Sequence, residues 1–146
     1  MKQYLYSLLL MLLCCMTAHA QSPSPKKEIK SSKTNTNMPL NTEKLSNSIV
    51  KSAIEALEKG DSKGWFSLFT DQAELYDDGR KMDFKSFFSK AIGHERFTSI
   101  DKVENNGLDL YGKFHSDQWG DFKTYFKFYL NENHKITKLE IGQANY

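Results

Sequence analysis

The chain of 146 residues contains little cysteine: Cys14 and Cys15 stand side by side near the N-terminus, and there are no others. A protein that begins beyond them has no thiol. It therefore cannot form a disulfide, use a cysteine nucleophile or bind zinc through cysteine. Long apolar runs are equally scarce, and the one from Leu5 to Met16 contains both cysteines. This run is too short to cross a bilayer comfortably, since spanning takes about 20 apolar residues.

The apolar run has the features of a secretory signal peptide. Lys2 precedes it with a positive charge, and residues 18–20 (Ala-His-Ala) provide a small-x-small cleavage site. We therefore expect residues 1–20 to be removed and the protein to be exported. A bacterial periplasm or the medium is favoured, because small eukaryotic secreted domains are often disulfide-bonded. A lipoprotein is the weaker alternative, since the bulky Leu13 precedes Cys14.

Proline is also scarce, and all three prolines (Pro23, Pro25, Pro39) lie in residues 21–44. This segment is rich in lysine, serine, threonine and asparagine, and it has no apolar period. Such a segment buries too little surface to offset its ordering entropy, so we expect a disordered linker.

A large charge excess is absent too. Without Lys2 there are 19 basic and 18 acidic residues, which favours no nucleic-acid partner.

Residues 45–146 hold all ten phenylalanines, both tryptophans and all eight glycines. About 100 residues is the usual size of one domain. Apolar residues at helical spacing predict a helix from Leu45 to Leu57, ended by Gly60. A short aromatic helix follows Asp61, and a third helix extends from Asp83 to Gly93.

The rest of this segment predicts strands and tight turns. Ala73–Tyr76 precedes the turn Asp77-Asp78-Gly79, and residues 105–107 (Asn-Asn-Gly) form a hairpin turn. Alternating residues predict strands at 97–103, 108–114, 122–130 and 136–141. Helices come first and strands last, with short links between consecutive strands. This order predicts an α+β fold with a mostly antiparallel sheet covered on one face by helices.

This order of elements resembles the nuclear-transport-factor-2-like superfamily, which includes SnoaL-like polyketide cyclases and ketosteroid isomerases. The resemblance lies in EALEKGD (55–61), WFSLFTDQAEL (65–75), DFKSFFSKAIG (83–93) and TYFKFYLNENHKITKLEIG (124–142). It implies a curved sheet wrapped around the N-terminal helices, a cystatin-like α+β roll whose conical interior can be a pocket. The chain looks most similar to exported members without a known activity.

The isomerase branch of this superfamily uses a carboxylate base and neutral hydrogen-bond donors. The resemblance matches the base to Asp77, but it matches the two donors to Ala53 and Phe126, which cannot donate. It therefore implies that steroid isomerisation is absent. Asp77 remains either a turn residue, as aspartate often is, or the single acid of a cyclase-like enzyme. In that enzyme Asp78 is the alternative acid, and Tyr76 or His94 would lie nearby.

Other candidate residues fall into two sets. Aromatic residues expected inside the cone are candidates for ligand binding, although such residues are equally typical of a core. These are Trp65, Phe69, Tyr76, Phe88 and Phe126. Alternate residues of one strand predict a basic, aromatic sheet face, either solvated or a homodimer interface. These are Lys123, Tyr125, Lys127 and Tyr129.

No cofactor is expected, and no metal. His94, His115 and His134 lack the spacing of a helical metal pair, and no glycine-rich phosphate loop occurs. The sequence thus favours an exported, non-catalytic domain that binds a small apolar or amphipathic ligand, with no membrane span after signal cleavage. Two alternatives stay open. One is an enzyme of the cyclase or isomerase kind with Asp77 as general base. The other is a dimeric scaffold that uses the tyrosine and lysine face.

Overall fold

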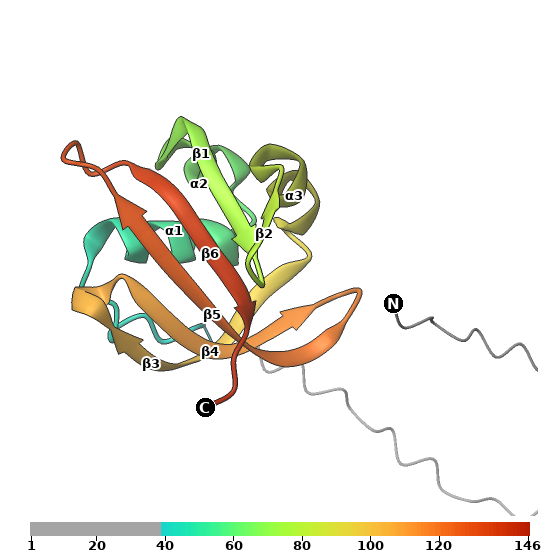
Figure 1. The fold of residues 1–146 in the computed structure, drawn as a ribbon. Helices are drawn as coiled ribbons and strands as arrows, with labels where there is room; N and C mark the ends of the chain where they lie inside the picture. Colours follow the sequence, from blue (N-terminus) through green and yellow to red (C-terminus); the bar gives the residue numbers. More distant parts are fainter. Residues whose placement is uncertain (1–38) are drawn as a thin grey trace, which may run out of the picture. The chain divides into compact units, whose positions relative to one another are not determined.

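A computed structural model describes residues 39–146, so the expected signal peptide and most of the expected linker lie outside the described residues. The described chain begins with two helices and ends with four strands (Figure 1). Its elements are α1 (Ser48–Lys59), α2 (Ser62–Ser67), β1 (Phe69–Asp77), β2 (Arg80–Met82), α3 (Phe84–Ala91), β3 (Glu95–Glu104), η1 (Asn105–Gly107), β4 (Asp109–Ser116), β5 (Gly120–Leu130) and β6 (Ile136–Gln143).

Each of the three α-helices begins at a polar cap that accepts backbone N–H groups of the first turn. The caps are Asn47, Asp61 and Asp83. As predicted, α1 ends at Gly60, which adopts a left-handed conformation with φ 66°. The predicted third helix is too long at its C-terminus, because Ile92 is already extended.

The six strands form one sheet in the order β2-β1-β6-β5-β4-β3. Only the β1–β6 pair of the sheet is parallel, which confirms the α+β class and the mostly antiparallel sheet. Two strand predictions were wrong. β1 begins at Phe69 rather than Ala73, and β2 was not expected. The start of β1 and the whole of β2 lack the alternation of buried and exposed residues that predicts a strand. Residues 71–72 and all of β2 are exposed.

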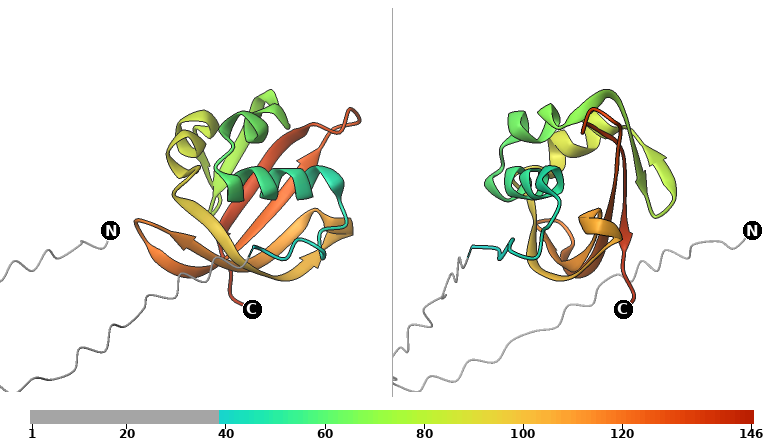
Figure 2. Two further views of the ribbon diagram at one scale, coloured as in Figure 1. Left: turned by 180° about the vertical axis from the view of Figure 1, so that it is seen from behind. Right: turned by 90° about the vertical axis from the view of Figure 1, so that its left-hand side faces the viewer.

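Bulges in β3 curve the sheet around α1. The pairing of β3 with β4 shifts register between Phe97 and Ser99 and again between Ile100 and Lys102. Opposite these shifts, the carbonyl of Ser99 occupies the place that a Cβ at Gly112 would need, so glycine is required there. Figures 1 and 2 show α1 across the concave side of the sheet, with β3, β4 and β5 curving beneath it.

Two groups of aromatic rings fill much of the interior. The first joins the helices to β1: the ring centroids of Trp65 and Phe88 lie 4.5 Å apart, as do those of Phe69 and Phe84. The second lies on the sheet, where Phe97 is 5.0 Å from both Phe114 and Phe126. Such tilted and edge-to-face pairs stabilise a core beyond the area that they bury.

The packed part of the chain starts before residue 45. Leu40 packs against the core, and the Lys44 ammonium group donates to the carbonyl of Ile100 over 3.1 Å. These residues fall within the segment that was predicted as linker. Among residues 39–146, no helix is long and apolar enough to span a lipid bilayer.

Glu58 joins α1 to β3. Its carboxylate accepts the backbone N–H of Phe97 over 2.7 Å, and burial raises the pKa of Glu58 from 4.5 to about 7. The folded protein therefore binds this proton more tightly than the unfolded chain does. The resulting stabilisation is fully present below about pH 4.5 and is lost as the pH rises through about 7.

We expect Glu58→Gln to become more stable than the wild type as the pH rises from about 5 to about 8, because glutamine still accepts the Phe97 N–H but does not ionise. The measurement is the difference in melting temperature between the two proteins across this pH range. Glu55→Gln on the more exposed side of α1 is the control. A difference that stays constant with pH would contradict the account.

Candidate functional site

A cavity of about 420 Å³ opens between α3, the β1–β2 turn and the β4–β5 hairpin. Small-molecule sites typically have volumes of about 300–1,000 Å³. Its floor is apolar and consists of Leu57, Phe88, Phe114, Phe126 and Ile141. Its polar lining comes from Asp77, Asp78, Glu95, Thr124 and Gln143. The cavity thus has the amphipathic lining of a ligand site.

The end of β1 brings Asp77 into this cavity. Successive strand residues face opposite sides of a sheet, so Asp77 shares the concave side with the buried Leu75. The turn that follows holds Asp78 at φ 46° and Gly79 at φ 78°. The Asp78 carboxylate accepts the backbone N–H of Gln143 over 3.1 Å, which fastens the turn to the end of β6.

Asp77 and Glu95 are half-buried acids that line the same cavity. Burial raises the pKa of Asp77, the charge of Asp78 raises it further, and Arg80 opposes the shift. Burial also raises the pKa of Glu95; the Ser116 hydrogen bond opposes this, and the charge of Asp77 adds to it. A negative charge on Asp77 therefore makes Glu95 harder to ionise.

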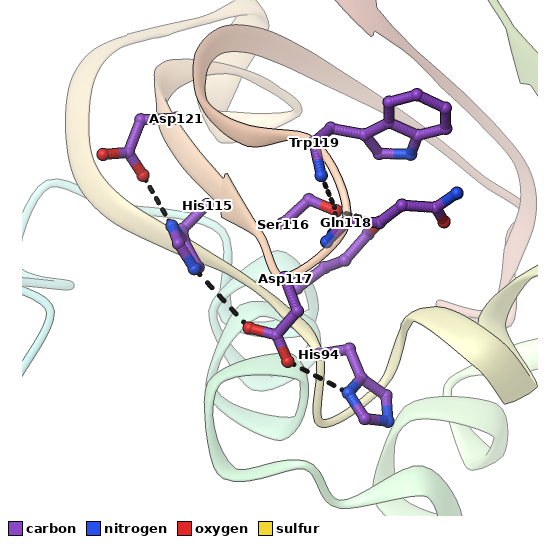
Figure 3. Close-up of polar contacts among 8 residues, drawn as sticks. His94, His115, Ser116, Asp117, Gln118, Trp119 and Asp121 are labelled. Carbon is purple, nitrogen blue, oxygen red and sulfur yellow. Dashed lines mark hydrogen bonds and ion pairs between the residues drawn. The ribbon is translucent and has the colours of Figure 1, made fainter. Parts of the chain in front are cut away.

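Ser116 connects Glu95 to the β4–β5 hairpin, and Figure 3 shows Ser116 beside Gln118 and Trp119 of this hairpin. Its side chain is 1% exposed, and its hydroxyl donates to Glu95 Oε1 over 3.1 Å. The same hydroxyl oxygen accepts the backbone N–H groups of Gln118 at 3.3 Å and Trp119 at 3.4 Å. One buried hydroxyl thus positions both an acid of the cavity and the turn that carries Trp119. The Trp119 side chain lines the cavity, although 72% of the residue is exposed.

A chain of histidines and aspartates joins the loop after α3 to this hairpin (Figure 3). His94 Nδ1 lies 3.0 Å from one Asp117 oxygen, and His115 Nε2 lies 3.5 Å from the other. His115 Nδ1 in turn lies 2.6 Å from Asp121. The hydrogen bond with His94 lowers the pKa of Asp117. Within the described part of the chain, no three histidine, cysteine or acidic side chains are grouped as a metal site.

A second cavity of about 570 Å³ adjoins the first. The two share the side chains of Phe87, Ala91, Glu95 and Trp119. Most of the residues that line the second cavity are polar, and it lies beside the histidine–aspartate chain. Its other lining residues include Asp83, Ser86, Lys90, His94, Asp117 and Gln118.

The structure separates the residues that were predicted to bind a ligand. Phe88 and Phe126 line the first cavity, as Asp77 does. Trp65 and Phe69 line neither of the two cavities and lie in the core, where their rings pack against Phe88 and Phe84 of α3. Tyr76 does not line the cavity. Strand alternation turns it to the convex face, where the Lys138 ammonium group lies 5.9 Å from its ring centroid.

Several residues of the site were not expected from the sequence. Glu95, Phe114, Trp119 and Thr124 line the cavity, yet none belongs to a recognisable motif. The alternation of β4 and β5 puts Phe114 and Thr124 on the concave face. No sequence pattern brings Glu95 to Ser116, since 21 residues separate them. That contact depends on the register of β3 against β4, in which these two residues are paired.

The predicted tyrosine and lysine face is the convex face of the sheet. Its charged and aromatic groups contact one another within the chain. The Lys127 ammonium group lies 5.5 Å from the Tyr125 ring, and Lys138 lies 3.7 Å from the Tyr129 ring. The Lys123 ammonium group donates to the carbonyl of Tyr146 over 2.7 Å. A homodimer through this face stays a prediction.

Comparison with known proteins identifies the fold. No protein-family model and no curated protein matches the chain. An NTF2-like protein of unknown function from Cytophaga hutchinsonii matches with TM-score 0.55 and 12% identity, over 66% of this chain and 87% of that one. A protein of unknown function with a cystatin-like fold from Xanthomonas campestris matches with TM-score 0.56 and 14% identity, over 66% and 88%.

A third match is the Orange Carotenoid Protein of Anabaena (Nostoc), solved with canthaxanthin bound. Its TM-score is 0.53 at 19% identity, over 65% of this chain and 35% of that protein. Identities this low show the fold alone. The chain therefore has the NTF2-like, cystatin-like α+β fold that the sequence predicted.

We expect Asp78→Asn to lower the pKa of Asp77, because the substitution removes the negative charge that adds to the effect of burial. Asparagine keeps an oxygen that accepts the Gln143 N–H, so the turn is retained. The pKa is measured by carboxyl ¹³C NMR titration. Asp71→Asn, at an exposed position of β1, is the control. An unchanged pKa of Asp77 in Asp78→Asn would show that the two charges do not interact.

Proposed function

We propose that this chain is an exported domain that binds a small amphipathic ligand in its cone. The apolar part of the ligand would occupy the floor of the first cavity, and its polar part would lie beside Asp77 and Glu95. The observation that carries the proposal is a space of about 420 Å³ beside a core otherwise packed with aromatic rings. The Orange Carotenoid Protein, which shares the fold, was solved with canthaxanthin and supports an apolar ligand.

The side chains around the cavity favour binding over the family's best-known chemistry. Ala53, one of the donor positions that the resemblance implies, is buried without a hydroxyl, and Phe126 presents an apolar ring to the cavity. The Thr124 hydroxyl donates to the carbonyl of Gly142 over 2.8 Å, so it is engaged within the chain. The two donor positions that the resemblance implies therefore hold no donor for an enolate oxygen.

The size of the cavity sets an expected affinity. Drug-sized ligands gain about 0.3 kcal/mol per non-hydrogen atom, so a ligand with about 20 such atoms gains about 6 kcal/mol. This corresponds to a Kd of about 40 µM. Probes should therefore be titrated over micromolar to millimolar concentrations.

We expect Nile red, a neutral apolar dye, to bind the protein with increased fluorescence, and we expect bulky substitutions in the cavity to abolish this binding. Ala91→Phe fills the cavity from α3, and Gln143→Trp fills it from the end of β6. Ser89→Phe, on the exposed side of α3, is the matched control and should bind like the wild type.

Circular dichroism must show that both filled variants fold. The two positions lie on different elements, so one folded variant suffices for the test. If a folded variant binds Nile red as tightly as the wild type, the dye does not occupy the cavity and the proposal fails.

A second candidate function is an enzyme with Asp77 as general base. It is favoured by the position of Asp77 at the cavity and by its raised pKa, since a base works best when its pKa lies near the operating pH. Such an enzyme would remove a proton from a carbon atom next to a carbonyl group.

This second function predicts that the protein accelerates deuterium exchange at the α-carbon of 2-tetralone, a small ketone, in heavy water. Exchange is followed by NMR. Removing a general base typically costs about 10²–10⁴-fold in rate, so Asp77→Asn should return exchange to the buffer rate. Asp71→Asn should have no effect. Equal rates for the wild type and Asp77→Asn would remove the enzymatic candidate and leave ligand binding intact.

A further inference from the structure

Acidic side chains line each of the two adjoining cavities. Carboxylates come from the β1–β2 turn, the start of α3, the start of β3 and the β4–β5 hairpin. They are Asp77, Asp78, Asp83, Glu95 and Asp117, against one lysine, Lys90. An anionic ligand would meet strong repulsion at this opening, so the lining selects against it.

The carboxylates nearest the apolar floor form no ion pair within residues 39–146, although Arg80 lowers the pKa of Asp77 and His94 lowers that of Glu95 against the larger effect of burial. Among the ion pairs formed within residues 39–146, none includes Asp77, Asp78 or Glu95. Burial disfavours the ionised forms of both acids, and neighbouring carboxylates add repulsion: Asp78 acts on Asp77, and Asp77 acts on Glu95. A ligand cation would remove that repulsion, since an opposite charge nearby favours the ionised form of a carboxyl group.

Trp119 adds an aromatic surface at the same place. It lines both cavities beside Glu95, and 72% of the residue is exposed. Its backbone N–H donates to the Ser116 hydroxyl (Figure 3), and the same hydroxyl donates to Glu95. A tryptophan face attracts cations, and aromatic rings are the usual recognition surface for quaternary ammonium groups.

We propose that the ligand is a cationic amphiphile whose ammonium-type group lies between the Trp119 indole and the carboxylates of Asp77 and Glu95. Its apolar body would occupy the floor formed by Phe114 and Phe126. This inference rests on the proposed binding function and specifies its ligand class. A neutral polar group would leave the negative charges of Asp77 and Glu95 without a counter-charge, and an anion would be repelled by them.

The test compares three probes that share an eight-carbon chain and differ in the charge of the head group. They are octyltrimethylammonium (cationic), octyl glucoside (neutral) and octanoate (anionic), each used below its micelle concentration to displace Nile red from the full chain. We expect the cation to bind about tenfold more tightly than the neutral probe, and octanoate to bind most weakly.

Two variants and a control localise the effect. Glu95→Gln keeps an oxygen for the Ser116 hydroxyl but loses the charge, so it should weaken octyltrimethylammonium about tenfold more than it weakens octyl glucoside. Trp119→Ala should also reduce the preference for the cation. Glu132→Gln, in the exposed β5–β6 turn away from the cavities, should change neither probe.

The outcomes separate this inference from the binding function. If Nile red binds but the three probes displace it equally, or octanoate binds best, the cationic ligand is ruled out and the apolar cavity stands. If Glu95→Gln leaves the preference for the cation intact, the assignment to this carboxylate fails. If Nile red does not bind the wild type at all, both the binding function and this inference fail.

Discussion

The packing of α1 against the concave side of the sheet is the constraint on which the rest of the structure depends. The buried face of the helix is formed by Val50, Ala53, Ile54, Ala56 and Leu57. Among the described residues of α1, Leu57 alone reaches the cavity. After Gly60 the chain turns into α2, so no further turn of α1 occupies the space beyond Leu57. The sheet continues past that point, and α3 covers the opening from the side.

The same geometry places acids in an apolar setting. Asp77 ends β1, Glu95 begins β3, and both elements reach the opening that α1 does not fill. Carboxyl groups in such a setting lose hydration, which raises their pKa and makes an uncompensated pair costly. Ser116 holds Glu95 in place rather than letting it rotate into solvent. Functional sites often contain such perturbed acids, and this is why the cavity is a better candidate than the convex face.

The convex face differs from the cavity in one physical respect. Its lysines lie over its own tyrosine rings and pair with its own acids, as Lys138 does with Tyr129 and Glu140. Exposed pairs of this kind contribute little to stability, yet they leave few charged groups without a partner. A ligand or a second copy would have to compete with contacts that already exist.

Local patterns were sufficient to predict most of the fold. The cap at Asp83, the turn at Asp77–Gly79 and the alternation of β5 depend on a few neighbouring residues, and each was expected from the sequence. β2 was missed because its three exposed residues carry no apolar pattern. Tyr76 was wrongly expected to bind a ligand. Alternate residues of a strand face opposite sides of the sheet, and the sequence did not show which residues of β1 face the cavity.

The site itself was only partly predictable. Asp77, Phe88 and Phe126 were expected at the cavity. Glu95 and Trp119 were not, because the register of β3 against β4, rather than any local spacing, brings Glu95 to the hairpin that carries Trp119. Trp65 and Phe69 resemble ligand contacts in sequence, and their burial depends on how α2 and α3 pack together.

We infer above all that the interior of the cone is a ligand site. The most direct measurement is intermolecular nuclear Overhauser effects between the alkyl chain of bound octyl glucoside and the aromatic protons of the protein. We expect contacts from the alkyl chain to Phe114 and Phe126 and none to Tyr129 on the convex face. Contacts to Tyr129 without contacts to Phe114 or Phe126, at saturating probe, would contradict it.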